Sequence, residues 1–463
     1  MGFGTNIYKS LNHPLRSLIL NTYALSLNLE RYGKKFDLLL EEFCRNEKMT
    51  LGEIQEYQRE KLTALIRHAY MHVPYYRETM NALKLKPADI KDVHDLPKLP
   101  LLTKEDVKAN YHRLKATNVP RYRVRHGHTS GTTGSPLEFL WDIDVCVAHH
   151  AADWRQKKWA GLNFGEPFVS LQGRQIVPLE QTIPPFWVMN RIHNQLFMSS
   201  FHLKDEHLHH YVSRIASFRP SAIEGYPSSL YILARYMERH GITLPVPAVL
   251  TSSETLLPLQ RELIEERFQC RVYDFYGMAE RVVYGSECDR HSGKHLNMDY
   301  GLTELVDGNG LPVSPGSPGR IVATGLWNLA MPLIRYKTSD VSRINVEGCA
   351  CGRPFPLMDH VTTKAEDIIV LKDGRLVPPS IMTHPFKPLK NIYLSQVVQE
   401  DYTEFTVYLA VNEHFTASEQ QQLYQGLKER LGTDARINIV ISDQLGKGLS
   451  GKFRWIISRV PLC

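Results

Sequence analysis

The sequence predicts an α/β protein, with a large α/β body that includes a β meander or small barrel and a small α+β domain after it. Three observations indicate this fold. Strand-like and helix-like segments alternate over about 120–275, short β segments surround a sharp turn over 300–345, and a β-β-α-β pattern follows. The expected domains are a body over 1–362, helical over about 1–118, and a mobile lid over 363–463.

The helical elements are predicted from spacing and capping residues. Leu62, Leu65, Ile66 and Ala69 fall at i, i+3, i+4 and i+7, which indicates a helix over about 55–72 that ends before a proline. A second helix is expected to begin after a capping threonine in the segment Thr-Lys-Glu-Asp that follows two prolines.

The central elements alternate in the manner of stacked α/β layers. After a glycine-rich loop, 137–142 is strand-like, and helices over about 230–237 and 256–263 flank a short apolar strand at 249–251. A further strand begins at 271. The C-terminal domain is predicted from a turn and four later elements, at 372–375, 391–398, 404–411, 417–431 and 436–441.

Composition excludes several classes of protein. Of 463 residues, 43% are hydrophobic and 22% are charged, which suits a globular core and argues against disorder. No run approaches the roughly 18 apolar residues of a membrane span. The net charge of +6 suits an anionic ligand, but no basic run of the nucleic-acid-binding type is present, so no nucleic-acid partner is expected.

Cysteine usage and the N-terminus predict a cytoplasmic protein. Seven cysteines are too few, and odd in number, for a disulfide scaffold, and no signal-peptide pattern opens the chain. The helical stretch at 12–45 mixes leucines with charged residues, so we expect it to pack on the body rather than lie on a membrane. The oligomeric state is left open.

The loop after His128 is the most distinctive motif. It contains two glycines and five hydroxyl side chains, whose backbone N–H groups and hydroxyls can surround phosphate oxygens. No Gly-Lys-Ser/Thr follows, so it is not a Walker loop, and an ordinary polar turn is the alternative. The candidate phosphate-binding residues are Thr129, Ser130, Gly131, Thr132, Thr133 and Gly134.

Three further segments contain residues suited to nucleotide chemistry. Tyr276 and Glu280 lie within five residues of each other and offer a stacking ring and a carboxylate for Mg²⁺, although aromatic residues after a strand usually belong to the core. Asp340 ends a basic strand and can accept hydrogen bonds from ribose hydroxyls, or simply cap the strand. Lys452 lies on a glycine-flanked loop and can approach a developing negative charge, or belong to a solvated basic tail.

In this order, the four segments resemble the adenylate-forming superfamily, and within it the phenylacetate–coenzyme A ligase-like branch with its CapK-type capsular polysaccharide biosynthesis proteins. The resemblance covers nearly the whole chain and includes the segments 73–77, 99–104, 225–228 and 253–254. It implies the adenylate-forming fold, with a C-terminal lid that rotates about a hinge near 363–367.

The resemblance assigns a role to each candidate residue. The 129–135 loop would hold the β- and γ-phosphates of ATP, Tyr276 would lie against adenine, and Asp340 would bind the ribose. Glu280 would ligate Mg²⁺, and Lys452 would approach the substrate carboxylate and α-phosphate. Thr132, Glu280 and Lys452 are the expected catalytic residues. Ser253, Glu254, Gly277 and Met278 complete the expected binding site, with Tyr226 and Ser252 beside them.

The implied reaction joins a carboxylic acid to AMP, with release of pyrophosphate, and then transfers the acyl group to a thiol such as coenzyme A. An amine or hydroxyl acceptor is the alternative, and a nucleotide-binding module without turnover is another. The chain departs from the family at Ser135, where many relatives have lysine, at Ser339, and at Thr363 and Lys364 in the hinge.

A cysteine pair predicts a structural zinc site. Cys349 and Cys351 are separated by one residue, and Cys288 lies upstream before two histidines. Three cysteines and one histidine suit tetrahedral Zn²⁺, and reduced cysteines in a turn are the alternative. Some phenylacetate ligase-like relatives resemble this pattern and hold zinc. His295 is preferred to His291 as the fourth ligand because of the family's Gly-x-His segment.

Overall fold

The computed structural model describes most of the chain. The described residues are 13–128, 137–174, 176–178, 180–359, 361, 369–373, 375–377, 379–386, 388–389, 391–442 and 455–460. The predicted phosphate loop at 129–135, the predicted hinge at 363–367 and Lys452 lie outside them. Among the described helices, none is long and apolar enough to cross a membrane.

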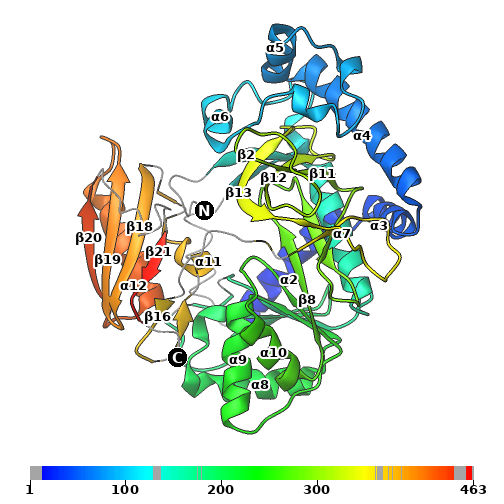
Figure 1. Ribbon diagram of the computed structural model, residues 1–463. Coiled ribbons are helices and arrows are strands. Elements are labelled where there is room, and N and C mark those ends of the chain that lie inside the picture. The colour runs from blue at the N-terminus through cyan, green and yellow to red at the C-terminus, as the bar shows by residue number, and fades with distance from the viewer. Residues whose placement is uncertain are drawn as a thin grey trace.

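The N-terminal part is helical and wraps one side of the body (Figure 1). A capping box at Thr50, whose side chain and Glu53 exchange hydrogen bonds, begins the predicted helix at Leu51. A second capping box, at Thr103, begins the short helix α6. The elements are α2 (His13–Arg31), α3 (Lys34–Asn46), α4 (Leu51–His72), α5 (Pro74–Ala82) and α6 (Lys104–Ala109).

Helix α2 packs on the body, as expected, although part of its apolar surface stays exposed. Asn21 joins it to the body, because its amide donates to the carbonyl oxygen of Met189 at 2.9 Å. Leu18 and Tyr23 nevertheless remain 63% and 58% exposed. One side of α2 therefore packs on strand β4 (Trp187–Asn190), while the other carries exposed apolar residues.

A ten-stranded sheet forms the centre, in the order β14-β15-β10-β9-β8-β7-β6-β3-β5-β4. Strands β5, β3, β6, β7 and β8 are parallel, and the flanking strands are antiparallel. Strand β7 is buried along its whole length, as expected for a parallel strand covered on both faces. The strands are β3 (Phe168–Leu171), β4 (Trp187–Asn190), β5 (Gln195–Met198), β6 (Ala222–Gly225), β7 (Ala248–Thr251), β8 (Arg271–Gly277), β9 (Tyr284–Glu287), β10 (Lys294–Leu296), β14 (Ile344–Asn345) and β15 (Leu357–Met358).

Helices cover both faces of the parallel strands. Helices α3 and α7 (Ile143–Trp159) share one core with Ala222, Leu250 and Tyr273 on one face. The other face packs against α8 (Asp205–Phe218), α9 (Pro227–Arg239) and α10 (Pro258–Phe268). The predicted α/β layers are confirmed, and the carboxyl ends of β3, β6, β7 and β8 are the edge at which ligands bind in such sheets.

The predicted meander is a three-stranded antiparallel sheet of β11 (Gly301–Val306), β12 (Gly319–Gly325) and β13 (Tyr336–Ser342). A hairpin of β1 (Val124–His128) and β2 (Glu138–Asp142) lies nearby, and its register pairs His128 with Glu138. These two strands are the described neighbours of the predicted phosphate loop.

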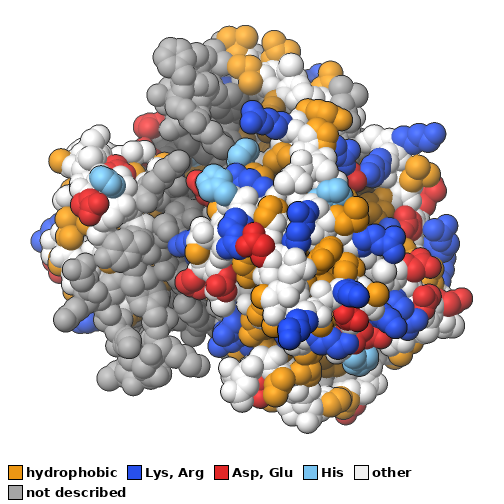
Figure 2. Space-filling model, turned by 90° about the horizontal axis from the view of Figure 1, so that it is seen from above, with side chains coloured by type: hydrophobic (Ala, Val, Ile, Leu, Met, Phe, Trp, Pro, Cys, Tyr) orange, Lys and Arg blue, Asp and Glu red, His pale blue; other side chains and the backbone are white. Residues whose placement is uncertain are grey.

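The C-terminal part is a separate small α+β unit, seen at the left of Figure 1. Its sheet has the order β20-β19-β18-β21, and its core includes leucines of α12 and the buried Trp455. The elements are β16 (Ile369–Val370), β17 (Leu376–Val377), α11 (Pro379–Met382), β18 (Ile392–Asp401), β19 (Glu404–Val411), α12 (Ala417–Leu431), β20 (Arg436–Ile441) and β21 (Ile456–Ser458). On the face drawn in Figure 2, basic and acidic side chains are interspersed.

Candidate functional site

Two of the predicted motifs meet across strands β8 and β13. Tyr276 lies near the end of β8, and its hydroxyl donates a hydrogen bond to Asp340 Oδ2 at 2.7 Å. Asp340 lies on β13, and its backbone N–H donates to Thr338 Oγ1. Burial raises the pKa of Tyr276 well above its usual value, and the Asp340 carboxylate adds to this, so the phenol stays protonated and donates. The hydrogen bond thus fixes the tyrosine ring and the Asp340 carboxylate next to each other.

Glu280 lies in the turn that follows β8. The residue is only 7% exposed, and its Oε1 accepts a hydrogen bond from the Tyr336 hydroxyl at 2.8 Å. Burial raises the pKa of Glu280, whereas the Tyr336 hydrogen bond and the nearby charge of Lys104 oppose that shift. A buried carboxylate held by one hydroxyl is suited to a divalent cation, because a cation would stabilise its charged form.

The hairpin β1–β2 is fixed next to this turn. Trp141 on β2 donates its indole N–H to the carbonyl oxygen of Ala279 at 3.0 Å. The guanidinium of Arg281 lies 4.0 Å from the centre of the Trp141 ring. The strands that precede and follow the predicted phosphate loop are therefore anchored beside Glu280, although the loop residues themselves are outside the described part.

The predicted residues after β7 form a second contact at the same sheet edge. Glu254 accepts a hydrogen bond from the backbone N–H of Ser228, in the first turn of α9, at 3.1 Å. The positive end of the helix dipole favours a carboxylate there. Ser253 has a left-handed backbone with φ of 70°, and its hydroxyl lies 3.3 Å from that of Ser252. Gly277 and Met278 are half-buried at the end of β8.

A buried arginine, which the sequence did not single out, fixes the strand that carries Tyr336. Arg335 forms a two-bond ion pair with Glu304 at 3.1 and 2.9 Å, and it donates to the carbonyl oxygens of Leu99 and Gly310. The backbone of Leu102 bonds to both neighbours of Tyr336. The 99–104 segment of the family pattern thus holds β13 in place.

A second unpredicted network joins α7 to the central sheet. The ammonium of Lys157 lies 2.6 Å from Asp153 Oδ2 and 2.7 Å from Glu224 Oε2, and only 5% of its side chain is exposed. Gln172 donates its amide to Glu224 as well. No local motif marks these residues, because they come from three separate segments and meet only in the fold.

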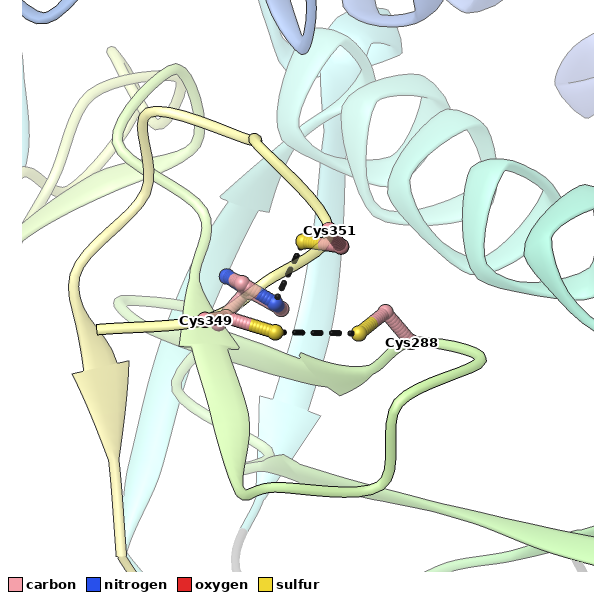
Figure 3. A group of neighbouring side chains, drawn as sticks. Cys288, Cys349 and Cys351 are labelled. Atoms are coloured by element: carbon pink, nitrogen blue, oxygen red, sulfur yellow. Dashed lines mark hydrogen bonds between the residues drawn. The ribbon is translucent and has the colours of Figure 1, made fainter. Parts of the chain in front are cut away.

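The four predicted zinc ligands come together between β9, β10 and the loop before β15 (Figure 3). Their ligand atoms all lie within 4.8 Å of one another. Cys288 Sγ is 3.6 Å from Cys349 Sγ, and Cys351 Sγ is 3.4 Å from His295 Nε2. Such a group offers four ligand atoms to one tetrahedral ion.

The surroundings of this cluster suit a metal. His295 Nδ1 lies 3.1 Å from the carbonyl oxygen of Phe355, which leaves Nε2 directed at the cluster. Burial, with a smaller contribution from the adjacent thiols, raises the pKa of Cys288 to about 12, so a nearby cation would be needed to hold a thiolate. His291, the competing candidate, instead lies 3.4 Å from Glu287 Oε2 and is not part of the group.

The fold is that of the adenylate-forming ligases. A crystal structure of 2-hydroxyisobutyryl-CoA ligase, in complex with 2-HIB-AMP and CoA in the thioesterification state, matches with a TM-score of 0.59 at 20% identity. The match covers 89% of this chain and 91% of that one. The fold predicted from the sequence is therefore confirmed.

Comparison with protein sequences gives relatives within this class. The C-terminal residues 369–459 match the family described as the CapK C-terminal domain. The chain is 25% identical over 420 residues to protein CapK of Staphylococcus aureus, covering 88% of this chain and 90% of that protein. It is 26% identical over 445 residues to the phenylacetate–coenzyme A ligase of Aromatoleum evansii, covering 90% and 96%. The predicted resemblance to the phenylacetate–coenzyme A ligase-like and CapK-type proteins is confirmed.

Proposed function

We propose that this protein is an ATP-dependent, AMP-forming ligase that activates a carboxylic acid and passes the acyl group to a thiol such as coenzyme A. The observation that carries the proposal is the joining of Tyr276 to Asp340 next to the Glu280–Tyr336 pair. Strand β8 of the large sheet and strand β13 of the three-stranded sheet thereby bring together an aromatic ring, a carboxylate proposed to bind ribose and a carboxylate proposed to bind a cation. The adenylate-forming fold and the ligase relatives support the same function.

In the first step, a carboxylate oxygen attacks the α-phosphorus of ATP. The bond from this phosphorus to the bridging oxygen breaks, and pyrophosphate leaves with the electron pair. Both reactants are anions, so the reaction needs positive charge where charge accumulates. Glu280 would hold Mg²⁺, which offsets the phosphate charge when bound. Lys452 and the 129–135 loop are proposed to contact the reacting groups, and Asp340 to hold the ribose.

In the second step, a thiolate attacks the carbonyl carbon of the acyl-adenylate and AMP leaves. An amine or hydroxyl acceptor is the second candidate, because the C-terminal unit matches the CapK C-terminal domain and CapK is a relative over most of the chain. A panel of thiols, amines and hydroxyl compounds, supplied to the preformed adenylate, separates the two candidates by the product formed.

The cluster of Cys288, His295, Cys349 and Cys351 is proposed to hold a structural Zn²⁺. It has four ligand groups and no free position for a substrate, unlike a catalytic zinc site. An ion there would join β9 and β10 to the loop before β15 and so brace one edge of the main sheet. Thiolate ligands need a reducing compartment, in keeping with the proposed cytoplasmic location.

The proposal is tested by replacing Lys452. We expect Lys452→Ala to lose most acid-dependent exchange between ATP and pyrophosphate while it still binds ATP, because a well-placed charge contributes about 3–4 kcal/mol to such a transition state. Exchange at the level of the unaltered protein would contradict the role of Lys452. Bound nucleotide with no exchange for any acid in a broad panel, even in the unaltered protein, would favour the binding module.

A further inference from the structure

One half-buried cation beside the candidate site has no anionic partner among the described residues. Arg281 directly follows Glu280 and is half-buried. Its Nη1 is shielded from solvent and has no hydrogen-bond partner. No carboxylate of the described chain lies within ion-pair distance of its guanidinium. Most other buried arginines differ, since Arg155 pairs with Asp299 at 2.6 Å and Arg335 pairs with Glu304.

The side chains that contact the Arg281 guanidinium are those of Trp141 and Cys146, and neither is a carboxylate. The indole of Trp141 faces the guanidinium at 4.0 Å. Arg281 also acts electrostatically on Cys146, His149 and Tyr300. Burial raises the pKa of the Cys146 thiol and lowers the pKa of His149 well below its usual value, so neither supplies a balancing charge.

A carboxylate that acts on the same cysteine, Glu30, is already paired with another arginine. Glu30 accepts two hydrogen bonds from Arg125, both at 2.9 Å. The carboxylates of Asp153 and Glu224 face Lys157 instead. The Trp141 ring stabilises a cation only partly, and an unpaired charge that is partly withdrawn from water destabilises the folded state. Arg281 also has a left-handed backbone, with φ of 57°, which is strained for a residue other than glycine.

An unpaired charge and a strained backbone are typical of a residue that completes its contacts only when a ligand binds. The missing partner is an anion that can reach a planar guanidinium, and a carboxylate matches its geometry with two parallel hydrogen bonds. Arg281 is one residue from Glu280, the proposed Mg²⁺ ligand. It lies on the side of the turn that faces α7, where Cys146 and His149 are on one face of the helix.

We propose that Arg281 binds the carboxylate of the acid substrate and orients it beside the Glu280 turn for attack on ATP. This inference depends on the proposed acid-activating function. Arg281 would contact the carboxylate of the acid before the reaction. Its positive charge would offset part of the repulsion between that carboxylate and the phosphates of ATP. The Trp141 ring would hold the guanidinium plane in position from its other side.

The test uses the full-length protein and exchange of pyrophosphate with ATP, with an acid that the unaltered protein accepts. We expect Arg281→Met to raise the KM for the acid by at least about tenfold, the worth of a charge-assisted hydrogen bond, and to change the KM for ATP less than about twofold. Arg281→Lys should recover part of the loss. An unchanged KM for the acid, or an equal rise for both substrates, would overturn the inference.

A stability measurement separates this inference from the proposed function. Arg281→Met removes an unpaired cation, so its thermal midpoint should equal or exceed that of the unaltered protein. Arg261→Met is the matched contrast and should lower the midpoint, because Arg261 pairs with Glu287 at 2.7 Å. A fall of several degrees in Arg281→Met would show a structural partner and overturn the inference. Absence of exchange in the unaltered protein would count against the proposed function. The thermal midpoint of Arg281→Met would still show whether Arg281 has a structural partner.

Discussion

The turn after β8 and the cysteine–histidine cluster are both proposed to hold a cation, yet they differ in how many ligand groups surround the proposed ion. Glu280 has one hydroxyl partner on one oxygen, Tyr336, and lies at the edge where the parallel strands end. The four cluster side chains direct their ligand atoms at one another. An open carboxylate can share an ion with a substrate, whereas a closed set of four ligands can only brace the fold. Substitutions in the turn after β8 should therefore lower activity, and substitutions in the cluster should lower stability.

The largest expected effect is at Glu280. Glu280→Gln keeps the size and the hydrogen bond from Tyr336 but removes the negative charge that would hold Mg²⁺. We expect adenylate formation to fall by roughly 10²–10³-fold, the usual cost of losing one electrostatic group at a reacting centre, with little change in thermal midpoint. Initial rates of ATP–pyrophosphate exchange at several Mg²⁺ concentrations provide the measurement.

The control for this variant is Glu238→Gln, which alters an exposed carboxylate on α9 that lies 3.4 Å from Arg235. It should leave the exchange rate unchanged. A Glu280→Gln protein with the same rate and the same Mg²⁺ dependence as the control would remove Glu280 from the proposed machinery.

The opposite result is expected at the cluster. Cys349→Ser removes one of four ligands, so we expect loss of stoichiometric zinc and a fall in the thermal midpoint of at least about 5 °C. Exchange activity measured well below that midpoint should change less than about threefold. Metal analysis and thermal unfolding check both halves, with Cys44→Ser as the control, because Cys44 is a half-buried thiol outside the cluster. Freshly purified protein without zinc would contradict the proposed site.

The smallest effect is expected at Tyr336. Its hydroxyl favours the ionised form of Glu280, so Tyr336→Phe should raise the pKa of that carboxyl further above its usual value. Activity that needs the carboxylate is present above this pKa and is lost as the pH falls through it. The acid limb of the pH–rate profile should therefore move to higher pH, with a loss of about fivefold near neutrality from one hydrogen bond. A profile that stays in place would show that the contact is only structural.

Much of this molecule was predictable because its signals are local. The helix at 55–72, the capped helix after Thr103 and the meander over 300–345 follow from spacing, capping and turn residues, and all are present. Tyr276, Glu280 and the cysteine pair were recognisable because each belongs to a short segment with a characteristic order.

The unpredicted features depend on contacts between distant segments. Helix α7 was not predicted, because its residues are buried around much of its circumference and show no clear amphipathic period. The Lys157 network and the Arg335–Glu304 pair join strands and helices far apart in the chain. Arg281 lies next to a recognised motif, but only the fold reveals that it has no counter-ion among the described residues.

The central claim is that the site formed by the end of β8, the turn after it and strand β13 activates a carboxylic acid with ATP. The most direct measurement is exchange of labelled pyrophosphate into ATP by the full-length protein with Mg²⁺, with no acceptor, across a broad panel of acids that includes phenylacetate and 2-hydroxyisobutyrate. The claim predicts exchange that depends on particular acids and is nearly abolished in Glu280→Gln. ATP binding without acid-dependent exchange for any member of the panel would contradict it.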